Sequence, residues 1–247
     1  MTRLVLLSGW GCDARIWQPL AEHWPHDVHV TTPDWPGVGG RLPQGDPDSL
    51  TELAETMAAD LPTEAVWVGW SLGGLLAATL LEHRHSPPRG LILLGMGGRF
   101  CDSGGVTRAE LAAFRRAFSR DPDATLAHFR RWQLGGEPRL RDAHRRLRAL
   151  LDEGPSPDPE SLAAGLAWLA ELDATAVLAD PPCPIRRLAG DRDPLLAAAA
   201  IADADRVLEH AGHCPMLSRP AALAEALAAL AVAMPPLRPA LTEEASS

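Results

Sequence analysis

The chain has 247 residues, of which 46% are hydrophobic, and a formal net charge of −9 at pH 7. This length suits one α/β domain with an insertion, or two small domains, with a large buried core. The acidic balance argues against general affinity for nucleic acid or for an anionic membrane surface. The four cysteines lie far apart without metal-type spacing and predict free thiols in a reducing compartment: Cys12, Cys101, Cys183 and Cys214.

The chain begins with Met1-Thr2-Arg3, which runs directly into the apolar Leu4-Val5-Leu6-Leu7. This run is too short for the apolar region of a signal peptide and is closed by Ser8-Gly9. We therefore expect a first strand at 3–7 in a cytoplasmic protein. Further short apolar runs predict strands at 28–32, 65–69, 90–95, 185–189 and 205–208.

Helical patterns lie between most of these runs, at about 48–61, 71–83, 194–202 and 219–233. The alternation of strands and helices predicts an α/β fold with a doubly wound, mostly parallel sheet. Ligands of such folds bind beyond the carboxyl ends of the strands.

Residues 101–171 interrupt this alternation, because they contain helical stretches broken by Gly135-Gly136 and no convincing strand. We expect them to form a helical lid over the active end of the sheet. The core then consists of 1–100 and 172–233, and 234–247 is expected to be a disordered tail.

The run Gly69-Trp70-Ser71-Leu72-Gly73-Gly74 lies directly between a predicted strand and a predicted helix. Gly-x-Ser-x-Gly in this setting is typical of a nucleophile elbow, a strained turn that exposes one serine hydroxyl and tolerates only small neighbours. Ser71 is therefore the candidate nucleophile. A glycine-rich turn with an incidental serine is the alternative, which the flanking strand and helix disfavour.

A nucleophilic serine needs an imidazole to take its proton and an acid to orient that imidazole. His213 is the candidate base, because Ala211-Gly212-His213-Cys214-Pro215 lies between the last predicted strand and the final helix. A loop at this place can bring the ring beside the elbow. An ordinary surface histidine is the alternative.

Two carboxylates compete for the role of the acid. Asp191 and Asp193 both lie in Gly190-Asp191-Arg192-Asp193-Pro194, directly after the predicted strand at 185–189. Asp193 is preferred, because the third residue after this glycine is the usual place of the acid in folds of this kind. Asp191 remains an alternative, and either carboxylate could instead cap the following helix.

Acyl transfer also needs hydrogen-bond donors for the oxyanion. In this arrangement they are backbone N–H groups, one from the residue after the nucleophile and one from an early glycine-rich loop. Leu72 follows Ser71 and supplies the first N–H. The loop Ser8-Gly9-Trp10-Gly11 supplies the second through Trp10, whose indole is expected to line the acyl pocket.

Three stretches together carry a family resemblance: Ser8-Gly9-Trp10-Gly11-Cys12 followed by Ile16-Trp17, Gly69-Trp70-Ser71-Leu72-Gly73-Gly74, and Ala211-Gly212-His213-Cys214-Pro215. The chain to about residue 233 resembles the α/β-hydrolase family and, within it, the pimeloyl-[acyl-carrier protein] methyl ester esterases of biotin synthesis. It departs from them in two places. Ser8 stands where these enzymes commonly have His, and Arg130-Arg131 occupy lid positions that are more apolar in them.

The resemblance implies hydrolysis of the methyl ester on a pimeloyl chain carried by acyl carrier protein, with release of methanol and without a metal or cofactor. It places substrate contacts at Trp10, Ser71, Leu72, Phe129, Arg130, Arg131, Trp132, Gln133 and His213. Lid arginines of the family contact the carrier protein, and Arg141 and Arg145 are the best positional matches.

Charge is unevenly distributed, because residues 101–150 contain 11 arginines and six acidic residues. Their net charge of +5 leaves −14 for the rest of the chain. A basic lid on an acidic body suits docking of a small acidic protein such as acyl carrier protein. One face of a helix expected at 138–151 carries Arg141, Arg145 and Arg148, opposite Ala143, Leu147 and Leu150. A solvated helix face is the alternative.

Other functions share these motifs. A general short-chain carboxylesterase, a thioesterase and a lactonase of this fold all use acyl-enzyme chemistry, so the triad does not separate them. A non-catalytic ligand-binding module is disfavoured, because nucleophile, base, acid and both oxyanion loops are all present.

Overall fold

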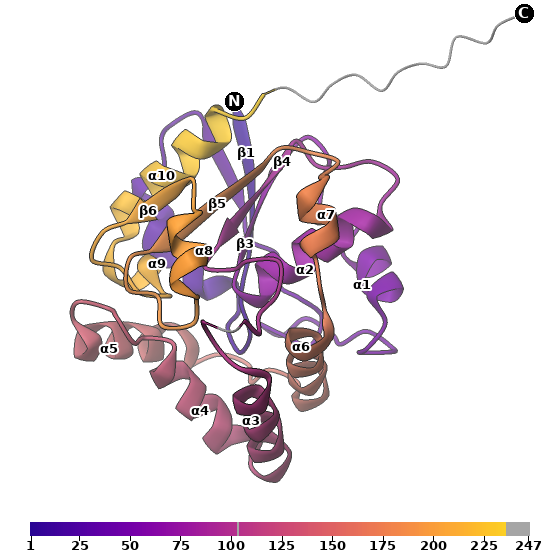
Figure 1. The fold of residues 1–247 in the computed structure, drawn as a ribbon, viewed down its shortest axis with the longest axis vertical. Helices are drawn as coiled ribbons and strands as arrows, with labels where there is room; N and C mark the ends of the chain where they lie inside the picture. Colours follow the sequence, from indigo (N-terminus) through magenta and orange to yellow (C-terminus); the bar gives the residue numbers. More distant parts are fainter. Residues whose placement is uncertain (103, 236–247) are drawn as a thin grey trace, which may run out of the picture.

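The computed structural model describes residues 1–102 and 104–235. Its centre is a sheet of six parallel strands in the order β2-β1-β3-β4-β5-β6 (Figure 1). The strands are β1 (Thr2–Leu7), β2 (Val28–Thr31), β3 (Val66–Trp70), β4 (Gly90–Leu94), β5 (Ile185–Gly190) and β6 (Arg206–Leu208). The strand order reverses between β1 and β3, and such switch points are where ligands bind in open α/β sheets.

The central strands β3 and β4 are buried along their whole length. Their residues are apolar on both faces, as expected of parallel strands that are covered on both sides. The register pairs Leu7 with Gly69 and Trp70 with Leu94. The carboxyl ends of β1, β3 and β4 therefore finish together at one edge of the sheet.

Helices cover both faces of the sheet, and each face has its own apolar cluster. One face carries η1 (Ala14–His23), α9 (Pro215–Ser218) and α10 (Pro220–Val232). The other face carries α1 (Leu50–Thr56), α2 (Leu72–Leu80), η2 (Leu81–His83) and α7 (Thr175–Ala179). A short helix, α8 (Ala198–Ala202), packs beside β5.

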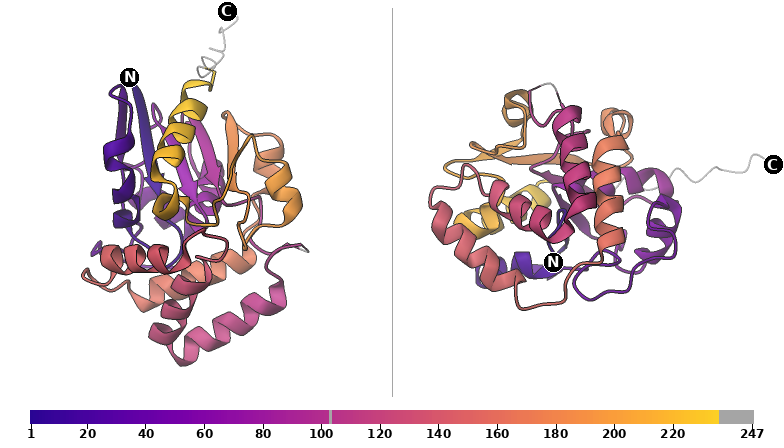
Figure 2. Two further views of the ribbon diagram at one scale, coloured as in Figure 1. Left: turned by 90° about the vertical axis from the view of Figure 1, so that its left-hand side faces the viewer. Right: turned by 90° about the horizontal axis from the view of Figure 1, so that it is seen from below.

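Four helices form the inserted region: α3 (Arg108–Arg120), α4 (Pro122–Trp132), α5 (Leu140–Leu151) and α6 (Pro159–Glu171). Local signals set their first residues, since Thr107 and Glu110 form a capping box at α3. Asp121 and Asp158, each followed by a proline, cap α4 and α6. The four helices lie beyond the carboxyl ends of the strands, opposite the N-terminus (Figures 1 and 2).

The predicted α/β class, with a parallel sheet and an inserted helical region, is confirmed. The helices expected at 48–61 and 194–202 are shorter than predicted, because only α1 and α8 within these ranges are helical. The sequence patterns missed η1, a 3₁₀ segment that contains Pro19.

The expected tail at 234–247 begins too early. Met234 is buried, and a Cβ on Gly90 would lie 3.2 Å from its methyl carbon, so the packed core extends to Met234. Residues 236–247 lie outside the described residues. Within the described part of the chain, no helix has the length and apolar character that crossing a bilayer requires. All four cysteines are free thiols.

Candidate active site

Ser71 occupies a strained turn between β3 and α2. Its φ of 55° and ψ of −127° lie in a region that non-glycine residues rarely adopt. A Cβ on Gly69 would lie 2.6 Å from the carbonyl oxygen of Gly73, and one on Gly73 would lie 2.5 Å from that of Ser8. Larger residues at these two positions would collide with backbone. The local structure is therefore that of a nucleophile elbow.

The imidazole of His213 pairs with the carboxylate of Asp193. The distance from His213 Nδ1 to Asp193 Oδ2 is 2.8 Å, and both side chains are buried. Gly95 directly follows β4 and has a φ of 62°. A Cβ on Gly95 would lie 3.0 Å from His213 Nδ1 and 3.1 Å from Asp193 Oδ2, so the pair lies directly against the end of β4.

The competing carboxylate, Asp191, does not reach the imidazole. Its Oδ1 accepts a hydrogen bond from the backbone N–H of Ala211 at 3.0 Å, and its Oδ2 lies 3.8 Å from Arg192 Nε. Asp191 thus links the two loops that carry Asp193 and His213. The structure places Asp193, and not Asp191, beside the candidate base.

Trp70 connects the base to the elbow. Its indole Nε1–H donates to the carbonyl oxygen of His213 at 2.8 Å, and the two ring centres are 5.4 Å apart. The backbone N–H of Ser71 donates to Leu94 O at 2.9 Å, which ties the candidate nucleophile to the last residue of β4. His213 Nε2 is buried without a hydrogen-bond partner among the described residues, so it is not bonded to Ser71 Oγ in this structure.

The predicted oxyanion donors lie on both sides of Ser71. A Cβ on Gly9 would lie 2.9 Å from Ser71 Cβ, so the loop that carries Trp10 contacts the elbow directly. Leu72 begins α2 and has no acceptor within its helix. Neither the Trp10 nor the Leu72 backbone N–H donates a hydrogen bond to any other described residue. Both N–H groups can therefore bind a developing oxyanion.

A family model described as "Alpha/beta hydrolase family" matches residues 4–226. The chain belongs to this family. The pimeloyl-[acyl-carrier protein] methyl ester esterase of Aromatoleum aromaticum is 35% identical over 240 residues, with 88% of this chain and 93% of that protein covered. Its counterpart in Vibrio vulnificus strain CMCP6 is 31% identical over 228 residues, with coverages of 88% and 89%.

Among solved structures, an esterase from Exiguobacterium antarcticum superposes with a TM-score of 0.77 over 94% of this chain and 92% of that one. At 17% sequence identity this likeness shows the fold alone. The predicted family and the predicted enzyme class, a carboxylic ester hydrolase of the α/β-hydrolase family, are confirmed.

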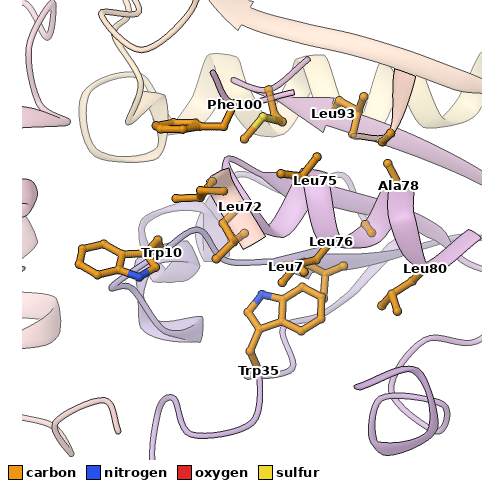
Figure 3. Close-up of a cluster of buried hydrophobic side chains, with 14 of the residues drawn as sticks. Leu7, Trp10, Trp35, Leu72, Leu75, Leu76, Ala78, Leu80, Leu93 and Phe100 are labelled. Carbon is orange, nitrogen blue, oxygen red and sulfur yellow. The ribbon is translucent and has the colours of Figure 1, made fainter. Parts of the chain in front are cut away.

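In this hydrolase the inserted helices pack on Trp10 and Leu72, the two predicted oxyanion donors. The Trp10 indole N–H donates to Leu162 O of α6 at 2.8 Å, and its ring contacts Phe129 of α4 at a centroid distance of 5.0 Å. A Cβ on Gly165 would lie 2.8 Å from Trp10 and 3.1 Å from Leu72, so α6 approaches both side chains closely. Figure 3 shows Trp10 and Leu72 side by side at the start of α2.

The aromatic residues predicted to bind substrate line an apolar cavity in the lid. Phe129 and Trp132 border a cavity of about 270 Å³, together with Phe114 of α3. The Phe129 ring contacts both Trp10 and Trp132. Two aromatic rings that line this cavity, those of Phe114 and Phe129, contact the Trp10 ring.

Of the polar residues predicted beside them, Arg130 and Gln133 contact other protein groups. Arg130 donates from Nε and Nη2 to the carbonyl oxygen of Gly11, at 3.2 and 3.0 Å, and so holds the loop that carries Trp10. Gln133 is buried with its Nε2 3.8 Å from Cys12 Sγ. Arg131 is exposed and lines a second cavity, of about 470 Å³, between α4 and α5. The helical pattern of the sequence does not reveal these contacts, because they connect segments more than 100 residues apart.

The three predicted docking arginines lie on the exposed face of α5. Arg141 is exposed, Arg145 Nη2 lies 2.8 Å from Asp142, and Arg148 Nε lies 2.6 Å from Asp152. The opposite face packs inward through Ala143 and Leu147. The predicted division of this helix into a charged and an apolar face is present in the structure.

Sequence reasoning missed Glu137, a buried lid carboxylate that contacts the loop of His213. The only sequence signal was Gly135-Gly136, which interrupts the helical pattern just before it. Among residues 1–102 and 104–235, no group of three or more His, Cys, Asp and Glu side chains is arranged to hold a metal ion.

Proposed function

We propose that this chain is a serine carboxylesterase that hydrolyses the methyl ester of pimeloyl-[acyl-carrier protein] in biotin biosynthesis. The buried His213–Asp193 pair beside a strained Ser71 carries the catalytic part of the proposal. The substrate part is supported by relatives named pimeloyl-[acyl-carrier protein] methyl ester esterase at 31–35% identity. We also propose a cytoplasmic location, where acyl carrier protein would be the partner.

The first half-reaction forms an acyl-enzyme. Ser71 Oγ attacks the ester carbonyl carbon while His213 Nε2 takes the hydroxyl proton, and Asp193 holds the other ring nitrogen. The N–H groups of Trp10 and Leu72 stabilise the oxyanion. The tetrahedral intermediate then expels methoxide, which leaves as methanol after taking the proton from His213.

The second half-reaction restores the enzyme. His213 Nε2 takes a proton from water, and the resulting hydroxide attacks the acyl carbon bound to Ser71. Collapse of this intermediate releases the free pimeloyl carboxylate on its carrier, and His213 returns the proton to Ser71 Oγ. Water is the nucleophile of this half-reaction, and His213 is the base and then the acid in both half-reactions.

The charge of the lid supports a carrier-bound substrate. Arg141, Arg145 and Arg148 project from α5 on the side away from the core. An acidic carrier protein would be attracted to this surface while its acyl arm reaches the elbow.

A general short-chain carboxylesterase, thioesterase or lactonase is the second candidate. Arg130 and Arg131 favour it, because they place charge where the related esterases are more apolar. The same acyl-enzyme chemistry serves all of these substrates. A non-catalytic binding module has the least support, because it would need neither the His213–Asp193 pair nor the strained turn.

Activity on matched esters tests the proposal. Purified protein is assayed on pimeloyl-[acyl-carrier protein] methyl ester and on free monomethyl pimelate, each with Ser71→Ala as a control. We expect kcat/KM at least tenfold higher for the carrier-bound ester. Equal values for both esters, or a preference for short-chain esters, thioesters or lactones, would overturn the substrate assignment.

A further inference from the structure

The lid inserts a short segment, Gly135-Gly136-Glu137, between the two loops that carry the acid and the base. A Cβ on Gly136, whose φ is 81°, would lie 2.9 Å from the carbonyl carbon of Arg192. A Cβ on Gly212 would lie 2.5 Å from the carbonyl oxygen of Gly135. The segment therefore contacts the acid loop on one side and the base loop on the other.

Glu137 is the side chain that this segment points into the protein. It is buried, with only 6% of its surface exposed. Its Oε1 accepts a hydrogen bond from the backbone N–H of Cys214 at 2.8 Å. A Cβ on Gly212 would lie 2.8 Å from the same oxygen. One carboxylate of the lid thus contacts the residues on both sides of His213.

This burial is energetically unfavourable for the carboxylate, and the protein compensates for it only in part. Burial raises the pKa of Glu137, against the lowering effects of the Ser218 hydroxyl, the backbone of Cys214 and Gly212, and the charge of His213. Oε2 is close enough to the Ser218 hydroxyl to interact with it, but the two groups do not meet in hydrogen-bond geometry. A buried polar group with an unpaired atom destabilises a fold, so its presence here calls for a role in addition to packing.

Besides Asp191 and Asp193, two buried thiols lie near this loop. Burial raises the pKa of Cys12 to about 11 and that of Cys214 well above its usual value, so both remain uncharged near pH 7. Cys214 Sγ lies 3.7 Å from Gln133 O, which adds a second contact between the lid and this loop. Glu137 provides the shorter of these two contacts, and it is the one with an ionisable side chain.

We propose that Glu137 is a positioning residue of the reaction, which holds the Cys214 N–H and thereby fixes the loop that presents His213 to Ser71. This inference rests on the proposed esterase activity. Glu137 does not touch the substrate. It couples the position of the lid to that of the base. The imidazole is correctly placed when the segment between α4 and α5 packs between the acid loop and the base loop.

Two substitutions separate the hydrogen bond from the charge. Glu137→Gln keeps an oxygen for the Cys214 N–H, and its amide nitrogen replaces Oε2 beside the Ser218 hydroxyl, which can accept. Glu137→Ala removes the acceptor. On a small neutral p-nitrophenyl ester we expect Glu137→Gln to stay within about threefold of wild-type kcat. Glu137→Ala should lower kcat about 10- to 100-fold, by analogy with the removal of groups that orient metal ligands, with KM within about twofold.

The concentration of functional sites is measured by the acyl-enzyme burst, so that loss of folded protein does not count as loss of turnover. Glu160→Ala is the matched control, because Glu160 is also a carboxylate of the inserted helices but is exposed in the first turn of α6. It should keep wild-type kcat. If Glu137→Ala does not fold, Glu137→Asp takes its place, since its side chain is one methylene too short to reach Cys214.

The outcomes distinguish this inference from the proposed function. An active wild type whose Glu137→Ala variant keeps full kcat overturns the positioning role alone. Equal losses in Glu137→Gln and Glu137→Ala also overturn it, because the hydrogen bond would then not be the effective contact. A wild type that forms no acyl-enzyme with any ester overturns the proposed function itself.

Discussion

At the scale of the residue, each oxygen of Asp193 has a separate partner. Oδ2 contacts the imidazole of His213, and Oδ1 accepts the backbone N–H of Leu195 at 2.9 Å. A carboxylate held at both oxygens cannot rotate freely, so the imidazole is held in one orientation. Asp191 has no such contact with the ring, although it lies only two residues away.

Removing the nucleophile or the base should abolish turnover. Ser71→Ala and His213→Ala should each lower kcat by about 10⁴-fold or more, because only binding and the oxyanion donors then contribute to catalysis. Hydrolysis of a p-nitrophenyl ester measures the loss, and circular dichroism checks that each variant folds. Turnover near the wild-type level in either pure variant would show that the assignment is wrong.

The two carboxylates of the acid loop should differ sharply. Asp193→Asn should lower kcat by about 10⁴-fold, by analogy with serine proteases in which the amide favours the wrong imidazole tautomer. Asp191→Asn should cost less than about tenfold, because it weakens only a link to Ala211. Both variants are assayed on the same ester at the same pH. The opposite ranking would identify Asp191 as the orienting acid.

At the scale of the element, the turn between β3 and α2 requires two glycines for reasons of space. The backbone of Gly73 and Gly74 approaches Gly69, and the backbone of Leu7 and Ser8 approaches Gly73. The strand and the helix can therefore meet at Ser71 only if these positions lack a side chain. The loop of Ser8 is also held from the core, because the Trp35 indole N–H donates to Ser8 O at 2.9 Å.

Adding one methyl group inside this turn should damage both stability and activity. Gly69→Ala should destabilise the fold by about 1–3 kcal/mol, because the new atom overlaps backbone that cannot move away. Gly97→Ala is the control, since the nearest atom to its Cβ is the Arg99 carbonyl oxygen at 4.0 Å. Urea denaturation of both variants measures the difference. A Gly69→Ala variant as stable as Gly97→Ala would contradict the steric argument.

At the scale of the whole molecule, positive charge gathers on one end and negative charge on the rest. The inserted helices lie over the carboxyl ends of the strands (Figure 2). Exposed arginines lie on α5. Arg3 is the second residue of β1, Arg206 is the first residue of β6, and Arg89 directly precedes β4. These three arginines therefore lie at the opposite end of the strands. An approaching acidic protein would therefore experience a different electrostatic potential at each end of the molecule.

Replacing arginines by alanine at either end of the molecule tests the docking of the carrier protein. Replacing Arg141, Arg145 and Arg148 by Ala should lower kcat/KM for the carrier-bound ester about tenfold or more, because encounter with an acidic partner would lose its attraction. Turnover of a small neutral ester should change less than about twofold. The matched triple variant of Arg3, Arg89 and Arg206 should leave both substrates unaffected.

Salt provides a second measurement on the wild type. Activity on the carrier-bound ester should fall as ionic strength rises, since the screening length shortens to about 8 Å at 0.15 M. Equal losses on both substrates would mean that the arginines support the structure of the lid. No loss on either substrate would mean that these arginines form a solvated helix face without a docking role.

The sequence by itself determined the alternation of strands and helices and the place of the elbow. Short apolar runs and the Gly-x-Ser-x-Gly turn are local features, and local sterics and hydrophobic burial suffice to predict them. His213 and Asp193 could also be named in advance, because their loops follow predicted strands. The choice between Asp193 and Asp191 rested on their spacing from one glycine.

Only the tertiary structure decided which distant groups meet. Arg130 on Gly11, Glu137 on Cys214 and the Trp70 indole on His213 are contacts between segments that the chain order does not pair. The first two depend on how α4 and the segment after it pack against loops of the sheet, and the third on how the loop of His213 packs against β3. Helical periodicity predicts which face of a lid helix is buried, but it does not specify the carbonyl or N–H group that a charged side chain finds there.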